Sequence, residues 1–121
     1  MVARRPWQFL LLVLTGAVCF LALTPSPSKQ VDLGWDKLNH AAAFAALSLS
    51  GCFGFPGSRR AVLGVTLALL GLGGLIEILQ LFVPGRSSEW GDLAADALGI
   101  ALGTALALGA LKVAQRVAPP T

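Results

Sequence analysis

Apolar residues are gathered into four long stretches that are separated by short polar segments. A helix needs about 20 apolar residues to cross a bilayer. The four stretches contain 18, 18, 23 and 21 residues and cover 7–24, 38–55, 61–83 and 93–113. Each is therefore predicted to be a membrane-spanning helix. The second is the weakest candidate, because it carries Asn39, His40, Ser48 and Ser50.

A water-soluble helical protein with buried helices is the alternative. Its helices would repeat a polar face every 3.6 residues, and stretches 61–83 and 93–113 have no such face. The composition also favours a membrane, with 55% hydrophobic and 12% charged residues and a mean hydropathy of +0.76. We predict an all-α fold: a single domain over residues 1–121 that forms an integral membrane bundle of four transmembrane helices.

The basic residues predict the orientation of this bundle. With four spans, one side of the membrane receives Arg4, Arg5, Arg59, Arg60, Lys112 and Arg116, and the other receives Lys29, Lys37 and Arg86. The positive-inside rule then places both termini in the cytoplasm of a multi-pass inner-membrane protein. All six acids fall near the outer side. The net charge of +3 therefore reports topology, and we expect no nucleic-acid partner.

The N-terminus has some features of a signal peptide, since Arg4 and Arg5 precede an apolar run. The run is longer than a usual signal core and lacks a small-residue cleavage site, so we expect an uncleaved first helix. Cys19 and Cys52 lie inside spans and are expected to pack as small apolar residues rather than to form a disulfide.

Small residues recur every four positions in the last stretch, at Ala95, Gly99, Gly103 and Ala107. Such a ribbon lets a neighbouring backbone approach closely. Its first expected use is packing within the bundle, and its second is a homo-oligomer through the Gly99/Gly103 face. Ala/Gly-rich spans also produce this spacing by chance. The short segment 56–60 predicts that the second and third spans are antiparallel neighbours.

Polar residues come in pairs near the outer ends of three predicted helices. Residues three or four apart share a helix face. Glu77 lies about 9 Å below the outer end of its helix, at about 1.5 Å per residue. Exposing carboxylates to lipid is costly, so we expect the pairs to turn inward around a shared pocket. The pairs are Asp36 with His40, Glu77 with Gln80, and Asp92 with Asp96.

These pairs, with two cations, form the predicted ligand-binding set: Asp36, Lys37, His40, Glu77, Gln80, Arg86, Asp92 and Asp96. Several members have simpler explanations. Asp36 and Asp92 suit helix N-caps, and Lys37 suits a side chain that reaches the headgroups. Glu77 fits such explanations least, because a carboxylate at its depth needs a specific partner. His40 and the carboxylates do not have a spacing diagnostic of metal, so we expect no metal and no cofactor.

Three motifs in order resemble the VanZ-like family of small bacterial membrane proteins. "DKLNHAAAF" matches D-K-x-x-H-x-x-x-F, "EILQLFVPGR" matches E-x-x-Q-x-x-x-P-G-R, and "DLAADALG" matches D-x-x-x-N-x-x-G. Asp96 departs from the family pattern, which has asparagine there, and it adds an acid to the set. The matching residues are Asp36, Lys37, His40, Phe44, Glu77, Gln80, Pro84, Gly85, Arg86, Asp92 and Gly99.

The resemblance implies an inner-membrane protein of a family named for a member linked to reduced teicoplanin susceptibility. Two functions are consistent with the residues. The leading hypothesis is a non-enzymatic protein that binds or modulates an anionic lipid, a lipid-linked precursor or a lipoglycopeptide, with Arg86 and Lys37 contacting anionic groups. The alternative is an enzyme acting on a lipid headgroup or glycan, with His40 and Glu77 as acid/base candidates. A structural protein without a ligand is a third possibility, and a proton or cation relay ranks last.

Overall fold

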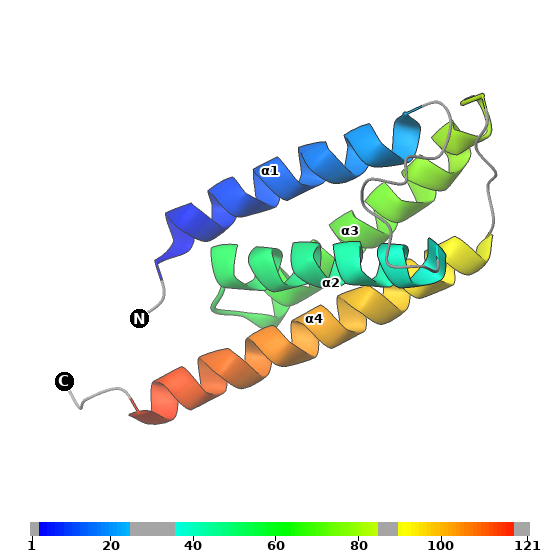
Figure 1. Ribbon diagram of the computed structural model, residues 1–121. Coiled ribbons are helices and arrows are strands. Elements are labelled where there is room, and N and C mark those ends of the chain that lie inside the picture. The colour runs from blue at the N-terminus through cyan, green and yellow to red at the C-terminus, as the bar shows by residue number, and fades with distance from the viewer. Residues whose placement is uncertain (1–2, 25–35, 85–89, 118–121) are drawn as a thin grey trace.

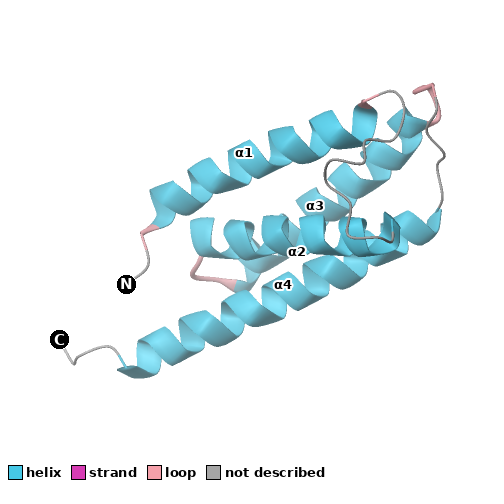
Figure 2. Cartoon of the chain, viewed as in Figure 1, coloured by secondary structure: helices cyan, strands magenta, loops and turns pink. Residues whose placement is uncertain are grey.

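The computed structural model describes residues 3–24, 36–84 and 90–117, with the side chain of Asp36 excepted. Within these ranges the chain is all-helical (Figures 1 and 2), as predicted. The four helices are α1 (Arg4–Leu23), α2 (Asp36–Gly54), α3 (Arg59–Gln80) and α4 (Trp90–Val117). Each helix begins and ends within a few residues of its predicted stretch, and α4 continues four residues beyond the end of its stretch.

Helix α2 is the central element, because it contacts all three other helices and packs most extensively on α4. The core beside it consists of Phe44, Leu47, Leu69, Ile76 and Ile100. Helix α1 has no buried residue, and the ring of Trp7 in its first turns lies against that of Phe53 with centroids 4.7 Å apart. α2 does contact α3, as the short connection predicts, but α4 is its main partner.

The short α2–α3 connection contains two residues that favour a turn and a new helix, Gly57 and Ser58. Gly57 has φ 119°, a left-handed backbone that favours glycine. Ser58 follows as the N-cap of α3, and its Oγ accepts a hydrogen bond from Ala61 N at 3.1 Å. We call the end of the bundle that holds this connection, the start of α1 and the end of α4 the termini end, and the opposite one the site end (Figure 1).

The small residues of α4 are used for packing within the chain. A Cβ at Gly99 would overlap the carbonyl oxygen of Ala41, and one at Gly103 would overlap that of Ala45. The α2 and α4 backbones are therefore in direct contact, which is the internal use expected from the sequence. A homo-oligomer through this face stays a prediction, and it would have to displace α2.

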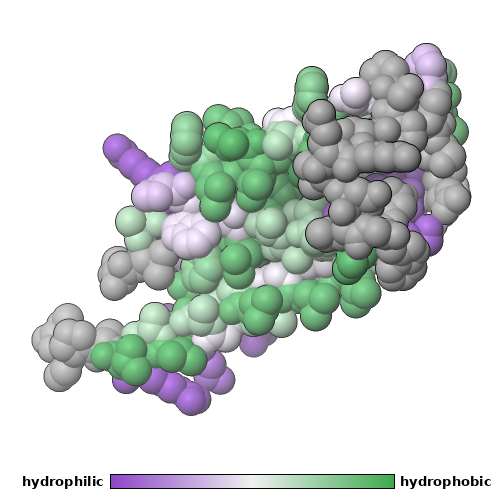
Figure 3. Space-filling view, in the orientation of Figure 1, coloured by the Kyte–Doolittle hydropathy of each residue, from purple (hydrophilic) through white to green (hydrophobic). Residues whose placement is uncertain are grey.

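Three helices, α1, α3 and α4, are long and apolar enough to cross a membrane. Helix α2 does not meet that criterion, and its position explains why. Ser48 lies at 0% exposure and donates a hydrogen bond to Ile100 O at 2.9 Å, within α4. This polar side chain of α2 thus contacts α4 and is shielded from the surroundings of the bundle. Figure 3 shows hydrophobic side chains over much of the visible middle of the molecule, with hydrophilic ones toward the ends.

Candidate functional site

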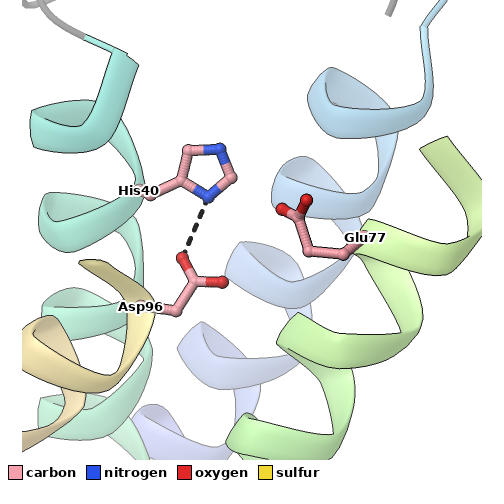
Figure 4. Close-up of side chains that lie close together, drawn as sticks. All are labelled: His40, Glu77 and Asp96. Atoms are coloured by element: carbon pink, nitrogen blue, oxygen red, sulfur yellow. Dashed lines mark hydrogen bonds and ion pairs between the residues drawn. The ribbon is translucent and has the colours of Figure 1, made fainter. Parts of the chain in front are cut away.

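Three polar side chains converge at the site end from three different helices. His40 comes from the start of α2, Glu77 from the end of α3 and Asp96 from the start of α4 (Figure 4). One nitrogen or oxygen atom from each lies within 4.8 Å of those of the other two. Glu77 and Asp96 are each only 1% exposed, so both carboxylates are held inside the bundle.

The pairing between α2 and α4 is regular because the two helices run in the same direction. Lys37 Nζ lies 3.2 Å from Asp92 Oδ1, and the Lys37 side chain is one-third exposed. One turn further along both helices, His40 Nδ1 lies 2.9 Å from Asp96 Oδ1. The imidazole of His40 therefore lies beside Asp96 inside the bundle. Lys37 lies near the surface, where its ammonium can remain solvated.

His40 also approaches a second carboxylate. Its Nε2 lies 3.7 Å from Asp92 Oδ2, while its Nδ1 faces Asp96. An imidazolium at this position would thus have a carboxylate oxygen near each nitrogen. With Nδ1–H donating to Asp96, the neutral ring instead leaves Nε2 as an acceptor. The orientation of His40 is fixed in both cases, which is a requirement for a side chain that exchanges protons with a bound molecule.

Gly73 of α3 provides the space that the Asp96 carboxylate occupies. A Cβ at Gly73 would lie 2.8 Å from Asp96 Oδ2, closer than real contacts of that kind. Glu77 follows on the same face of α3, one turn nearer the site end. Gly73 is one of several glycines in the stretch 61–83. Its position four residues before Glu77, on the face that carries the carboxylate, was the signal that could have found this role.

The hydrogen bond of Gln80 goes to α1 and not to the His40–Asp96 pair. Its Nε2 donates a hydrogen bond to Ala22 O of α1 at 3.0 Å, so it links the ends of α1 and α3. The side chain is buried, and its Oε1 has no hydrogen-bond partner among the described residues. Arg86 and the side chain of Asp36, both members of the predicted set, lie outside the described parts of the chain.

The donor set of His40, Glu77 and Asp96 also has the composition of a metal site, with one imidazole and two carboxylates. The sequence spacing could not reveal this grouping, since each side chain comes from a different helix. Without an ion, His40 and Asp96 are hydrogen-bonded to each other, and the Glu77 carboxylate lies close to both. As an acid–base cluster, the three groups can accept protons from ligand amines or hydroxyls and exchange protons with a reacting group.

These observations define an all-helical membrane protein with a buried acid–histidine cluster near one end of the bundle. Comparison with family models assigns it further: the model described as VanZ/LLP1 matches residues 7–112. The chain therefore belongs to the VanZ/LLP1 family, which confirms the resemblance drawn from the motifs. Searches of curated proteins and of solved structures found no match.

Proposed function

We propose that the protein is a four-span inner-membrane protein with both termini in the cytoplasm. The exposed basic residues of the termini end support this orientation, because cytoplasmic segments are enriched in Lys and Arg. In this proposal α2 also spans the membrane, together with α1, α3 and α4, and its neighbours shield it from lipid. The site end faces the outside. The basic residues are Arg4, Arg5, Arg59, Arg60, Lys112 and Arg116.

In this orientation the site binds the polar part of an envelope amphiphile from the outer face. The candidate ligands are an envelope lipid, a lipid-linked precursor or a lipoglycopeptide of the teicoplanin type. The observation that carries the proposal is the convergence of His40, Glu77 and Asp96 within 4.8 Å. Buried carboxylates accept hydrogen bonds from amines and hydroxyls. Lys37, which is partly exposed beside them, and Arg86 of the family motif provide the cations for a phosphate or carboxylate.

The binding proposal is tested with three variants, Glu77→Gln, His40→Ala and Arg86→Ala, in a strain that expresses the full chain. Teicoplanin susceptibility is measured together with the lipids that co-purify with each variant. We expect Arg86→Ala and Glu77→Gln to lose a co-purified lipid or a susceptibility change that wild type shows, because both remove ligand contacts. If all three variants behave as wild type, the cluster is structural and the proposal is wrong.

The second candidate function is an enzyme that performs acid/base chemistry on a lipid headgroup or glycan. It is favoured by the contact of His40 Nδ1 with Asp96 at 2.9 Å, since a catalytic base is commonly oriented by a hydrogen-bonded neighbour. His40 and Glu77 would exchange the protons. The same variants separate the two functions: a new lipid product that disappears in His40→Ala supports the enzyme, and binding without product in every variant supports the binding protein.

A further inference from the structure

A groove runs between α3 and α4 from the termini end toward the middle of the bundle. It consists of two adjoining cavities of about 520 Å³ and about 370 Å³. Both are lined by Thr66 of α3 and Leu108 of α4, so they meet at these two residues. We call this feature the α3–α4 groove. Near the site end the same two helices are in close contact, where Gly73 meets Asp96 and Leu93.

The walls of the α3–α4 groove are apolar over most of its length. Val62 and Leu70 line the α3 side, and Ala101 and Leu108 line the α4 side. In a membrane, a groove of this kind is open to hydrocarbon and not to water. The occupant that these walls favour is therefore an acyl chain.

The length of the groove matches one leaflet of a bilayer. From Arg59 to Leu70 it extends roughly 16 Å along α3, and from Lys112 to Ala97 roughly 22 Å along α4, at about 1.5 Å per residue. A bilayer is about 30 Å thick in its hydrocarbon core and about 40–45 Å with its headgroups. A single lipid that enters from the termini end would thus have its chain beside Leu70 and its headgroup beside Arg59.

The mouth of the groove is basic. Arg59 and Lys112 line it from opposite helices, and both are exposed. Ser58, the N-cap of α3, also lines it, so the positive end of the α3 dipole lies at the same place. No acid is among the described residues that line either cavity. Basic pockets between membrane helices are typical sites for anionic headgroups.

We propose that the α3–α4 groove binds one anionic glycerophospholipid, with its phosphate between Arg59 and Lys112 and one acyl chain between α3 and α4. This lipid site lies at the opposite end of the bundle from His40, Glu77 and Asp96. It is independent of the function proposed for that cluster. In the orientation proposed above, the lipid belongs to the inner leaflet.

The headgroup contact is tested on the full chain in detergent micelles by native mass spectrometry. The probes are phosphatidylglycerol, which is anionic, and phosphatidylcholine, which is zwitterionic. We expect wild type to retain phosphatidylglycerol preferentially and the double variant Arg59→Gln/Lys112→Gln to lose that preference by about 10- to 30-fold. The matched control, Arg4→Gln/Arg5→Gln, removes the same charge at the same end outside the groove and should keep the preference.

The proposal is overturned if the two double variants lose the preference equally, because the lipid would then respond only to surface charge. It is also overturned if inorganic phosphate displaces the phosphatidylglycerol at millimolar concentration, since the chain would then contribute nothing to binding.

The acyl-chain contact is tested separately by filling the groove without changing its charge. Thr66→Phe places a ring where the two cavities meet, and we expect it to lower retention of phosphatidylglycerol about tenfold. Leu67→Phe is the matched control, because Leu67 is exposed and does not line the groove. Circular dichroism confirms that each variant is folded. Unchanged retention in a folded Thr66→Phe variant would contradict the proposed position of the chain.

Discussion

The interface between α2 and α4 contains polar groups of two different kinds, in two regions. At the site end it contains ionisable groups, with Lys37 beside Asp92 and His40 beside Asp96. Toward the termini end it contains neutral hydroxyls, with Ser48 Oγ 2.6 Å from Thr104 Oγ1. The two backbones approach closely at Gly99 and again at Gly103, so this close packing does not require the charges.

This contrast shows which polar groups packing alone explains. The hydroxyls satisfy each other and a backbone carbonyl within the interface, which is the usual way that polar residues join membrane helices. Carboxylates are a far more expensive means of holding two helices together, since breaking a buried pair leaves an uncompensated charge. The contacts of Ser48 and Thr104 are accounted for by helix packing alone, whereas a functional role for the ionisable groups of the site end remains the proposal that the variants below test.

The largest expected effect comes from the backbone contact that both regions share. Gly99→Val places a branched side chain against the Ala41 carbonyl, which cannot move without separating α2 from α4. We expect a loss of at least about 3 kcal/mol of unfolding free energy, measured by steric trapping or thermal unfolding in detergent. The control is Gly109→Val, since a Cβ at Gly109 meets nothing within 4 Å. Equal losses in both variants would mean that α4 does not pack on α2 through Gly99.

The two kinds of polar pair are expected to differ in energy and in function. Asp96→Ala removes the carboxylate that faces His40 and should lower the free energy of unfolding by about 2–4 kcal/mol. It should also abolish any ligand binding. Ser48→Ala should cost only about 0.6–1 kcal/mol and leave binding intact. Asp96→Asn, the residue that the family pattern has at this position, keeps an acceptor for His40 and should be less destabilising than Asp96→Ala. If Ser48→Ala proved as costly as Asp96→Ala, the proposed contrast would be wrong.

The smallest expected effect is that of metal removal. We expect EDTA to shift the Tm of the purified chain by less than about 1 °C, because His40 and Asp96 are hydrogen-bonded to each other without a metal. Added Zn²⁺ is the complementary measurement. A Tm increase with Zn²⁺ that is lost in His40→Ala would show that His40, Glu77 and Asp96 hold a metal, contrary to the expectation from the sequence.

Much of the fold could be predicted because hydropathy acts locally along the chain. The four apolar stretches predicted the helices. The positions of Glu77 and Asp96 relative to the ends of their helices predicted that both lie at a similar height along the bundle axis. The motif order indicated the VanZ-like family, which the match over residues 7–112 confirms. These features depend on residues close in sequence, so a single chain carries the information.

The partners of the polar groups could not be predicted, because they depend on which helices are neighbours. The short connection between α2 and α3 indicated an antiparallel pair, yet the main partner of α2 is α4. Sequence also grouped Gln80 with Glu77, whereas its amide nitrogen bonds to Ala22 of α1. For α2, hydropathy alone is a weak guide, since a helix surrounded by protein does not need an apolar surface.

The sequence by itself determined the helices, the family and the level at which the acids lie, since each follows from local composition and spacing. Only the tertiary structure decided that His40 meets Asp96, that Gly73 makes room for that carboxylate, and that α3 and α4 separate into a groove below it. The physical reason is that contacts between helices depend on how their surfaces fit. Gly99 and Gly103 bring α4 onto α2, and every pairing along that interface follows from this approach.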